Sequence, residues 1–124
     1  MKIKRLTPIL WTENLEETLT FYTDILGFVC GEYNEEWQWA ALHQNEVELM
    51  IAKPNEHSPY EKIGFTGSFY FEVDDVDFLW EKLKNQVEIV YELATFDWGM
   101  KEFAIKDTNG YILQFGQNAP NDEG

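Results

Sequence analysis

The sequence predicts an α+β protein made of two βαβββ modules, one after the other along the chain. Three observations support this prediction. Eight short segments alternate between apolar and polar residues, as half-buried strands do, whereas the segments 13–28 and 74–85 carry apolar residues at helical spacing. The order of these segments is the same in both halves, which indicates an internal repeat. Because one half of about 60 residues would bury only a marginal core by itself, we expect the halves to pack together or to be exchanged between chains.

The first module spans residues 1–53. Pro8 places its first strand at a sheet edge or at a strand start. Asn14 is the expected N-cap of the helix, and Glu17 stands three positions later, as in a capping box. Gly27 supplies the signal for the end of the helix. The strands expected in this module are 2–11, 28–34, 37–42 and 46–53.

Residues 54–67 contain the Pro, Gly and polar residues of a linker, after which the pattern restarts. The second module spans 68–118, and its helix opens at Asp74 or Asp75. Residues 119–124 form a tail, so that the whole chain, 1–124, is predicted to be a single domain. The last two strands flank an Asn-Gly pair, which is a strong hairpin signal. The strands expected in this module are 68–73, 87–93, 101–107 and 111–116.

The composition restricts the partners and the location that we expect. Nine basic and 23 acidic residues give a formal charge of −14, which argues against a nucleic-acid partner and favours a cationic one. The lone Cys30 excludes an intramolecular disulfide and suits a reducing cytoplasm. The first residues lack the apolar region of a signal peptide, and no apolar run reaches transmembrane length. We therefore expect a cytoplasmic protein that does not bind membranes.

Four segments carry a resemblance to a known family: NLEETLTFYTDILGF, VELMIA, FYFEVDDVD and WGMKEFAIKDTNGYILQFGQ. Their order resembles the vicinal oxygen chelate superfamily, which contains glyoxalase I, extradiol dioxygenases and bleomycin-resistance proteins. The resemblance covers about residues 3–118. It implies a glyoxalase/bleomycin-resistance-type fold with open, cup-shaped mixed sheets, and a homodimer. Whether the modules pair within one chain or are swapped across the dimer stays open.

In metal-dependent members of this superfamily, the first and last strands of each module each supply one metal ligand inside the cup. The matching residues are Thr7, Glu48, Ser68 and Gln114, and the two halves overlay with Thr7 on Ser68 and Glu48 on Gln114. Only Glu48 offers a carboxylate, whereas transition metals prefer imidazole, thiolate or carboxylate ligands. The resemblance therefore implies neither a metal nor another cofactor here.

Two histidines remain as possible replacements for the missing ligands. His43 precedes the turn before Glu46, and His57 lies in the linker. Nothing in the sequence places either of them beside Glu48. We expect both to be solvated loop residues.

Strand alternation from the four matched positions predicts an aromatic and acidic cup. Trp98 lies in the polar loop TFDWGM, which core packing explains poorly. Exposed rings beside carboxylates suit a flat, positively charged ligand. Trp37 and Trp39 project from one strand face, and they line either the pocket or the core and dimer interface. The predicted ligand-binding residues are Thr7, Trp11, Trp37, Trp39, Glu48, Ser68, Tyr70, Glu72, Trp98 and Gln114.

The pattern resembles most closely the bleomycin-resistance branch, whose members lack the metal ligands and sequester a cationic, partly planar antibiotic. This resemblance implies a metal-independent binding protein rather than an enzyme. The alternative is a glyoxalase-like lyase or isomerase with a degenerate metal site, in which Glu48 acts as a general base. A third possibility is a dimer whose cup is filled by its own side chains. The sequence names neither the ligand nor a reaction.

Overall fold

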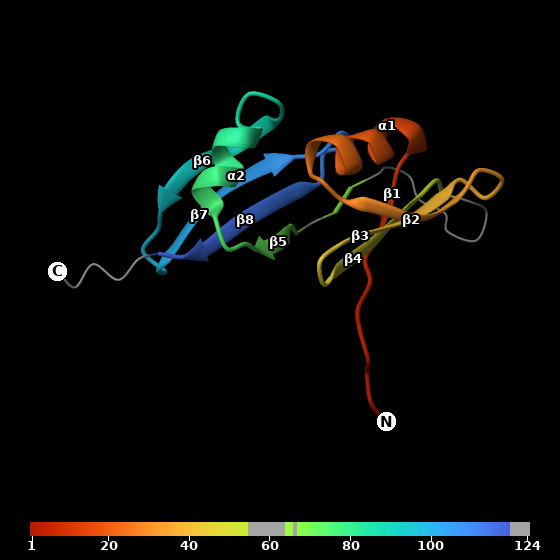
Figure 1. Ribbon diagram of the computed structural model, residues 1–124, viewed down its shortest axis with the longest axis horizontal. Helices are drawn as coiled ribbons and strands as arrows, with labels where there is room; N and C mark the ends of the chain where they lie inside the picture. Colours follow the sequence, from red (N-terminus) through yellow and green to blue (C-terminus); the bar gives the residue numbers. More distant parts are fainter. Residues whose placement is uncertain (55–63, 66, 120–124) are drawn as a thin grey trace. The chain divides into compact units, whose positions relative to one another are not determined.

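The computed structural model describes residues 1–54, 64–65 and 67–119 of the chain (Figure 1). The chain divides into two compact units, 1–63 and 64–124. Each unit contains one open, four-stranded mixed sheet with a helical segment between its first and second strands. The predicted α+β class and the βαβββ order are therefore confirmed. Most of the predicted linker, including His57, lies outside the described residues.

In the first unit the strands lie in the order β1-β4-β3-β2, with β1 parallel to β4 and the other pairs antiparallel. The strand predicted at 2–11 is too long, because only its last three residues pair with β4. Pro8 directly precedes this pairing, and its carbonyl accepts the N–H of Met50 at 2.9 Å. The elements are β1 (Ile9–Trp11), α1 (Leu15–Thr20), the π-helical segment η1 (Phe21–Ile25), β2 (Val29–Asn34), β3 (Trp39–Gln44) and β4 (Val47–Ala52).

The start of α1 confirms the predicted N-cap. The side chain of Asn14 accepts the N–H of Glu17 at 3.0 Å. The backbone N–H of Asn14 donates to the hydroxyl of Thr12 at 3.0 Å instead of to Glu17, so only half of the predicted capping box forms. Gly27 ends the helical segment with a φ of 83°, a left-handed conformation that glycine adopts without strain.

The second unit repeats this strand order as β5-β8-β7-β6, with β5 parallel to β8. Its helix lies against β7 and β8 (Figure 1). Phe103, Leu113 and Phe115 are buried on that side of the sheet, and Trp80 of the helix packs on Phe103 with ring centroids 5.2 Å apart. The elements are β5 (Phe69–Glu72), α2 (Val76–Leu83), β6 (Glu88–Thr95), β7 (Met100–Lys106) and β8 (Ile112–Asn118).

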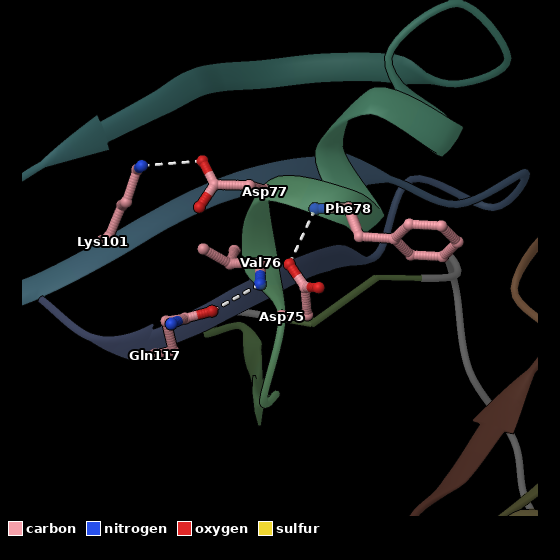
Figure 2. Close-up of polar contacts among 6 residues, drawn as sticks. All are labelled: Asp75, Val76, Asp77, Phe78, Lys101 and Gln117. Atoms are coloured by element: carbon pink, nitrogen blue, oxygen red, sulfur yellow. Dashed lines mark hydrogen bonds and ion pairs between the residues drawn. The ribbon is translucent and has the colours of Figure 1, made fainter.

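Three polar contacts fix the first turn of α2, and two of them join it to the sheet (Figure 2). Asp75 is the N-cap and accepts the N–H of Phe78 at 3.1 Å. The next N–H of the helix, from Val76, donates to the side-chain oxygen of Gln117 on β8. Lys101 of β7 forms an ion pair with Asp77 at 2.7 Å. The helix start is therefore fixed by sequence-local capping and by two neighbouring strands.

The predicted hairpin between the last two strands is also confirmed. One carboxylate oxygen of Asp107 accepts the N–H groups of Asn109 and Tyr111 at 2.8 and 2.9 Å. Gly110 takes a φ of 89°, which a residue with a side chain rarely adopts. This turn sets the register of β7 on β8, and so decides which residues share the sheet face opposite α2.

Candidate ligand-binding site

The face of the second sheet opposite α2 carries a polar cluster around Glu102 of β7. The Glu102 side chain is 1% exposed. Its Oε1 accepts the indole N–H of Trp98 at 2.8 Å and the hydroxyl of Tyr70 at 3.2 Å. Its Oε2 accepts the hydroxyl of Tyr91 and, at 3.5 Å, the amide of Gln114. Both oxygens of this buried carboxylate therefore have hydrogen-bond donors, as a buried charge requires.

Gln114 links this cluster to the start of β5. Its amide nitrogen donates to the hydroxyl of Tyr91 at 2.9 Å, and its carbonyl oxygen accepts the hydroxyl of Ser68. Both ends of the carboxamide are thus engaged within the protein. The Gln114 side chain serves as a connector between two strands on this face.

The two tyrosines of the cluster keep their protons well above neutral pH. Burial raises the pKa of Tyr91 to about 12; the hydrogen bond and charge of Glu102 add to this effect, and the hydrogen bond from Gln114 opposes it. Burial also raises the pKa of Tyr70, followed by the negative charges of Glu102 and then Glu72. Both hydroxyls therefore act as donors toward Glu102 at neutral pH.

Aromatic rings form the exposed rim of the cluster. Trp98 is 65% exposed, and one face of its indole stacks on Phe96, with centroids 4.7 Å apart and planes 8° apart. Tyr70 is 45% exposed. Because Glu102 holds the indole N–H, the exposed ring has a fixed position beside a buried negative charge. Such an arrangement favours a flat cation through stacking and cation–π attraction.

The first unit has a separate hollow of about 510 Å³ on its sheet. Glu48 lies in it and forms an ion pair with the guanidinium of Arg5. Three of the predicted ligand-binding residues line this hollow, namely Thr7, Trp39 and Glu48. Other residues that line it were not predicted to bind a ligand. The polar and large side chains lining it include Arg5, Thr7, Trp39, His43, Glu48 and Met50.

The prediction that His43 lies in a loop is wrong, although the residue is exposed as expected. This residue lies in β3 and is the direct cross-strand partner of Glu48, so that both line the hollow. The strand runs to Gln44, two residues beyond the predicted end, because the following turn is tight and Asn45 takes a φ of 54°. A histidine expected in a solvated loop therefore stands beside the carboxylate.

The remaining predicted residues lie outside these two clusters or at their margins. Trp37 is 72% exposed in the turn before β3, so the prediction that it shares a strand face with Trp39 is wrong, because β3 begins only at Trp39. Trp11 is half-buried at the end of β1, opposite Ala52, and outside the lining of the hollow. Glu72 is exposed at the end of β5 and acts on Tyr70 by its charge.

Sequence reasoning missed Glu102 and Tyr91. A signal for Glu102 was present, because alternation with Phe103 turns it to the sheet face that Gln114 occupies on the paired strand. No such signal existed for Tyr91. The pairing of β6 shifts register on both sides of this residue, so alternation does not determine its direction.

The sheet registers also change the overlay of the two halves. Ile9 and Tyr70 are 61 residues apart, as are the N-caps Asn14 and Asp75. The registers pair Ile9 with Met50 and Tyr70 with Gln114. Met50, and not Glu48, therefore occupies the position in the first sheet that corresponds to Gln114.

The residues at the matched ligand positions do not fit the metal that the fold family implies. In the second unit the Gln114 carbonyl and the Ser68 hydroxyl are hydrogen-bonded to each other, and in the first unit Glu48 is paired with Arg5. Across residues 1–54, 64–65 and 67–119, no group of three or more His, Cys, Asp or Glu side chains is arranged to hold a metal ion. Transition metals bind neutral oxygens such as those of Ser68 and Gln114 poorly, and the Glu48 carboxylate is already paired with Arg5.

A family model matches residues 2–115 and describes the Glyoxalase/Bleomycin resistance protein/Dioxygenase superfamily. The chain belongs to this superfamily. No curated protein matches the sequence closely enough to count as a relative. Among the described residues there is no helix with the length and apolar character needed to cross a membrane.

Solved structures share the fold at low sequence identity. A glyoxalase/bleomycin resistance protein/dioxygenase from Nocardioides has a TM-score of 0.78 at 17% identity, with 100% of this chain and 90% of that chain covered. TnmS3, an antibiotic binding protein from Streptomyces sp. CB03234, has a TM-score of 0.78 at 18% identity, with 96% and 99% covered. A lactoylglutathione lyase from Agrobacterium tumefaciens has a TM-score of 0.71 at 17% identity, with 94% of this chain and 96% of that chain covered. Binding proteins and enzymes thus share this architecture.

Proposed function

We propose that this protein binds and sequesters a flat, positively charged small molecule without transforming it, as the bleomycin-resistance branch does. The observation that supports this function is the buried Glu102 carboxylate, which holds the exposed rings of Trp98 and Tyr70 at its edge. Preorganised aromatic rings lose little entropy when a ligand stacks on them, and the charge beneath them favours a cation. The net charge of −14 adds long-range attraction for the same ligands.

The state of the polar groups in the second unit favours binding over catalysis. A general base must reach a proton of the substrate, either directly or through one water molecule. Glu102 is 1% exposed and is occupied by donors from the protein, and Gln114 has both ends engaged. These groups position other side chains, and binding needs no metal.

A second function is supported by the first-unit hollow. Glu48 and His43 face each other across β3 and β4 and are both exposed, so that they are able to act as an acid–base pair. A lyase or isomerase that removes a proton from a small substrate would use this arrangement. Its substrate would displace Arg5 from Glu48, because that ion pair occupies the carboxylate.

Titration of chelator-treated protein with metal-free bleomycin, followed by tryptophan fluorescence and calorimetry, tests the first function. We expect saturable binding with quenching of the fluorescence. Trp98→Phe should abolish this quenching, and Trp37→Phe, a control at a similarly exposed position, should leave it unchanged. Zn²⁺, Mn²⁺ and Ni²⁺ should give no stoichiometric heat. Stoichiometric metal binding without drug binding would overturn the proposal and direct attention to Glu48 and His43 as an enzymatic site.

The oligomeric state and the location of the protein are proposed on separate grounds. We infer a homodimer, since the superfamily pattern implies one, and sedimentation equilibrium at micromolar concentration tests it by the mass of the particle. A monomer would contradict this inference and leave the binding proposal intact. The cytoplasmic location stays a prediction from the single cysteine.

A further inference from the structure

Gly116 of β8 lies between two glutamates on the neighbouring strands. The sheet register pairs Gly116 with Glu72 on β5 and with Glu102 on β7, and residues paired in this way project from the same face. No described lysine or arginine forms an ion pair with either glutamate. The space above Gly116 is therefore flanked by two negative charges.

The outer end of Tyr70 now occupies that space. A Cβ atom built on Gly116 would lie 2.0 Å from the Tyr70 hydroxyl oxygen and 2.9 Å from the ring carbon that carries it. The phenol fits there only because residue 116 has no side chain. The pKa of Tyr70 is raised by burial and then by the charges of Glu102 and Glu72, which places its hydroxyl in the field of both carboxylates.

Of the two donors to Oε1 of Glu102, Tyr70 is the one that a ligand displaces more easily. Its hydrogen bond is 3.2 Å long, beyond the usual 2.7–2.8 Å for two oxygens, whereas Trp98 donates at 2.8 Å. Tyr70 is also 45% exposed, so its ring is able to turn toward solvent. After this turn Glu102 still has Trp98 and Tyr91 as donors.

We propose that a hydrogen-bond-donating cation, a primary ammonium or guanidinium group attached to an aromatic ring, takes the place of the Tyr70 hydroxyl above Gly116. The cation donates to Glu102 and lies between Glu72 and Glu102, while the displaced Tyr70 and the exposed face of Trp98 stack on the ligand's ring. This inference rests on the proposed function and deepens it, because it names the group by which the ligand is recognised. The proposal predicts that cations with an N–H bind more tightly than quaternary ammonium ions, which carry the same charge without an N–H.

Calorimetric titration with 2-naphthylmethylammonium, its N,N,N-trimethyl analogue and neutral 2-naphthylmethanol tests the proposal. We expect the wild type to bind the primary ammonium about tenfold more tightly than the trimethyl analogue, since a hydrogen bond to a charged group is involved. Glu102→Gln should remove this preference. Tyr70→Phe should bind the primary ammonium at least as tightly as the wild type, because no hydroxyl has to be displaced. Tyr33→Phe, a half-exposed tyrosine of the first unit, is the matched control and should change nothing.

Equal affinity of the wild type for the two cations would overturn the proposed site for a hydrogen-bond-donating cation. The proposed function, binding of a flat cation, would remain. Equal affinity for all three probes would overturn the recognition of charge as well. Absence of binding overturns the subsite, and it counts against the proposed function only if metal-free bleomycin also fails to bind. If Glu102→Gln does not fold, Glu72→Gln at the exposed side of the same space replaces it, with a smaller expected loss of affinity for both cations; no loss would overturn the proposal.

Discussion

The indole N–H of Trp98 donates to Oε1 of Glu102 at 2.8 Å, so that a buried carboxylate fixes a ring that is 65% exposed. Aromatic residues in loops are usually mobile unless a specific contact holds them. Here the loop between β6 and β7 is short, and the stack of Trp98 on Phe96 adds a second restraint. The rim of the cluster is therefore ordered before a ligand arrives.

Substitution of Trp98 by Phe should lower the free energy of unfolding by about 1 kcal/mol, because the hydrogen bond to Glu102 is lost while a ring remains to stack on Phe96. Urea unfolding followed by circular dichroism measures this change. Trp37→Phe is the control and should change the free energy by less than about 0.5 kcal/mol, since Trp37 is exposed in a turn. Equal effects of the two variants would contradict an ordered rim.

The stability of the second unit should fall in alkaline solution because of Tyr91. In the unfolded chain this tyrosine ionises with its ordinary pKa of 10.0, and in the folded protein with a pKa of about 12, so between these values the unfolded state binds fewer protons. This contribution is complete below pH 10 and is lost as the pH rises through 12. The difference in unfolding free energy between the wild type and Tyr91→Phe, measured across this range, should therefore shrink with rising pH. A pH-independent difference would show that the pKa of Tyr91 is not raised.

Gly116→Ala should expel the Tyr70 ring from its present place. The new Cβ would overlap the Tyr70 hydroxyl, and the ring is free to turn outward because it is half-exposed. The lost hydrogen bond and the reduced entropy of the unfolded chain oppose each other, so the net change in unfolding free energy should stay within about 1 kcal/mol. Phenolate absorption, compared with that of Gly116→Ala/Tyr70→Phe, should show the pKa of Tyr70 returning toward its ordinary value. An unchanged Tyr70 pKa would contradict the packing over Gly116.

Asp75→Ala should lower the free energy of unfolding by about 1 kcal/mol, because the N–H of Phe78 loses its acceptor at the start of α2. Thermal unfolding in a calorimeter measures this change. Asp75→Asn is the matched control, since its side-chain oxygen also caps a helix. Its free energy of unfolding should stay within a few tenths of a kcal/mol of the wild-type value. A loss of similar size in both variants would indicate that charge, and not the cap, stabilises this helix end.

Local chemistry along the chain was sufficient to predict the elements and their order. Asn14 and Asp75 cap helices because their side chains reach N–H groups three residues ahead. Alternation turned Phe103 and Phe115 toward α2 and Gln114 to the opposite face. These signals operate within a few residues, so they do not depend on contacts with distant parts of the chain.

Strand pairing decided the content of the candidate sites, because register joins residues that are far apart in sequence. It placed His43 beside Glu48, made Met50 the counterpart of Gln114, and put Gly116 between two glutamates. Irregular pairing in β6 directed Tyr91 to Glu102, against any simple period. The sequence by itself therefore determined the repeated βαβββ fold, whereas only the tertiary structure decided which polar groups meet, because the buried Glu102 carboxylate finds most of its donors on other strands.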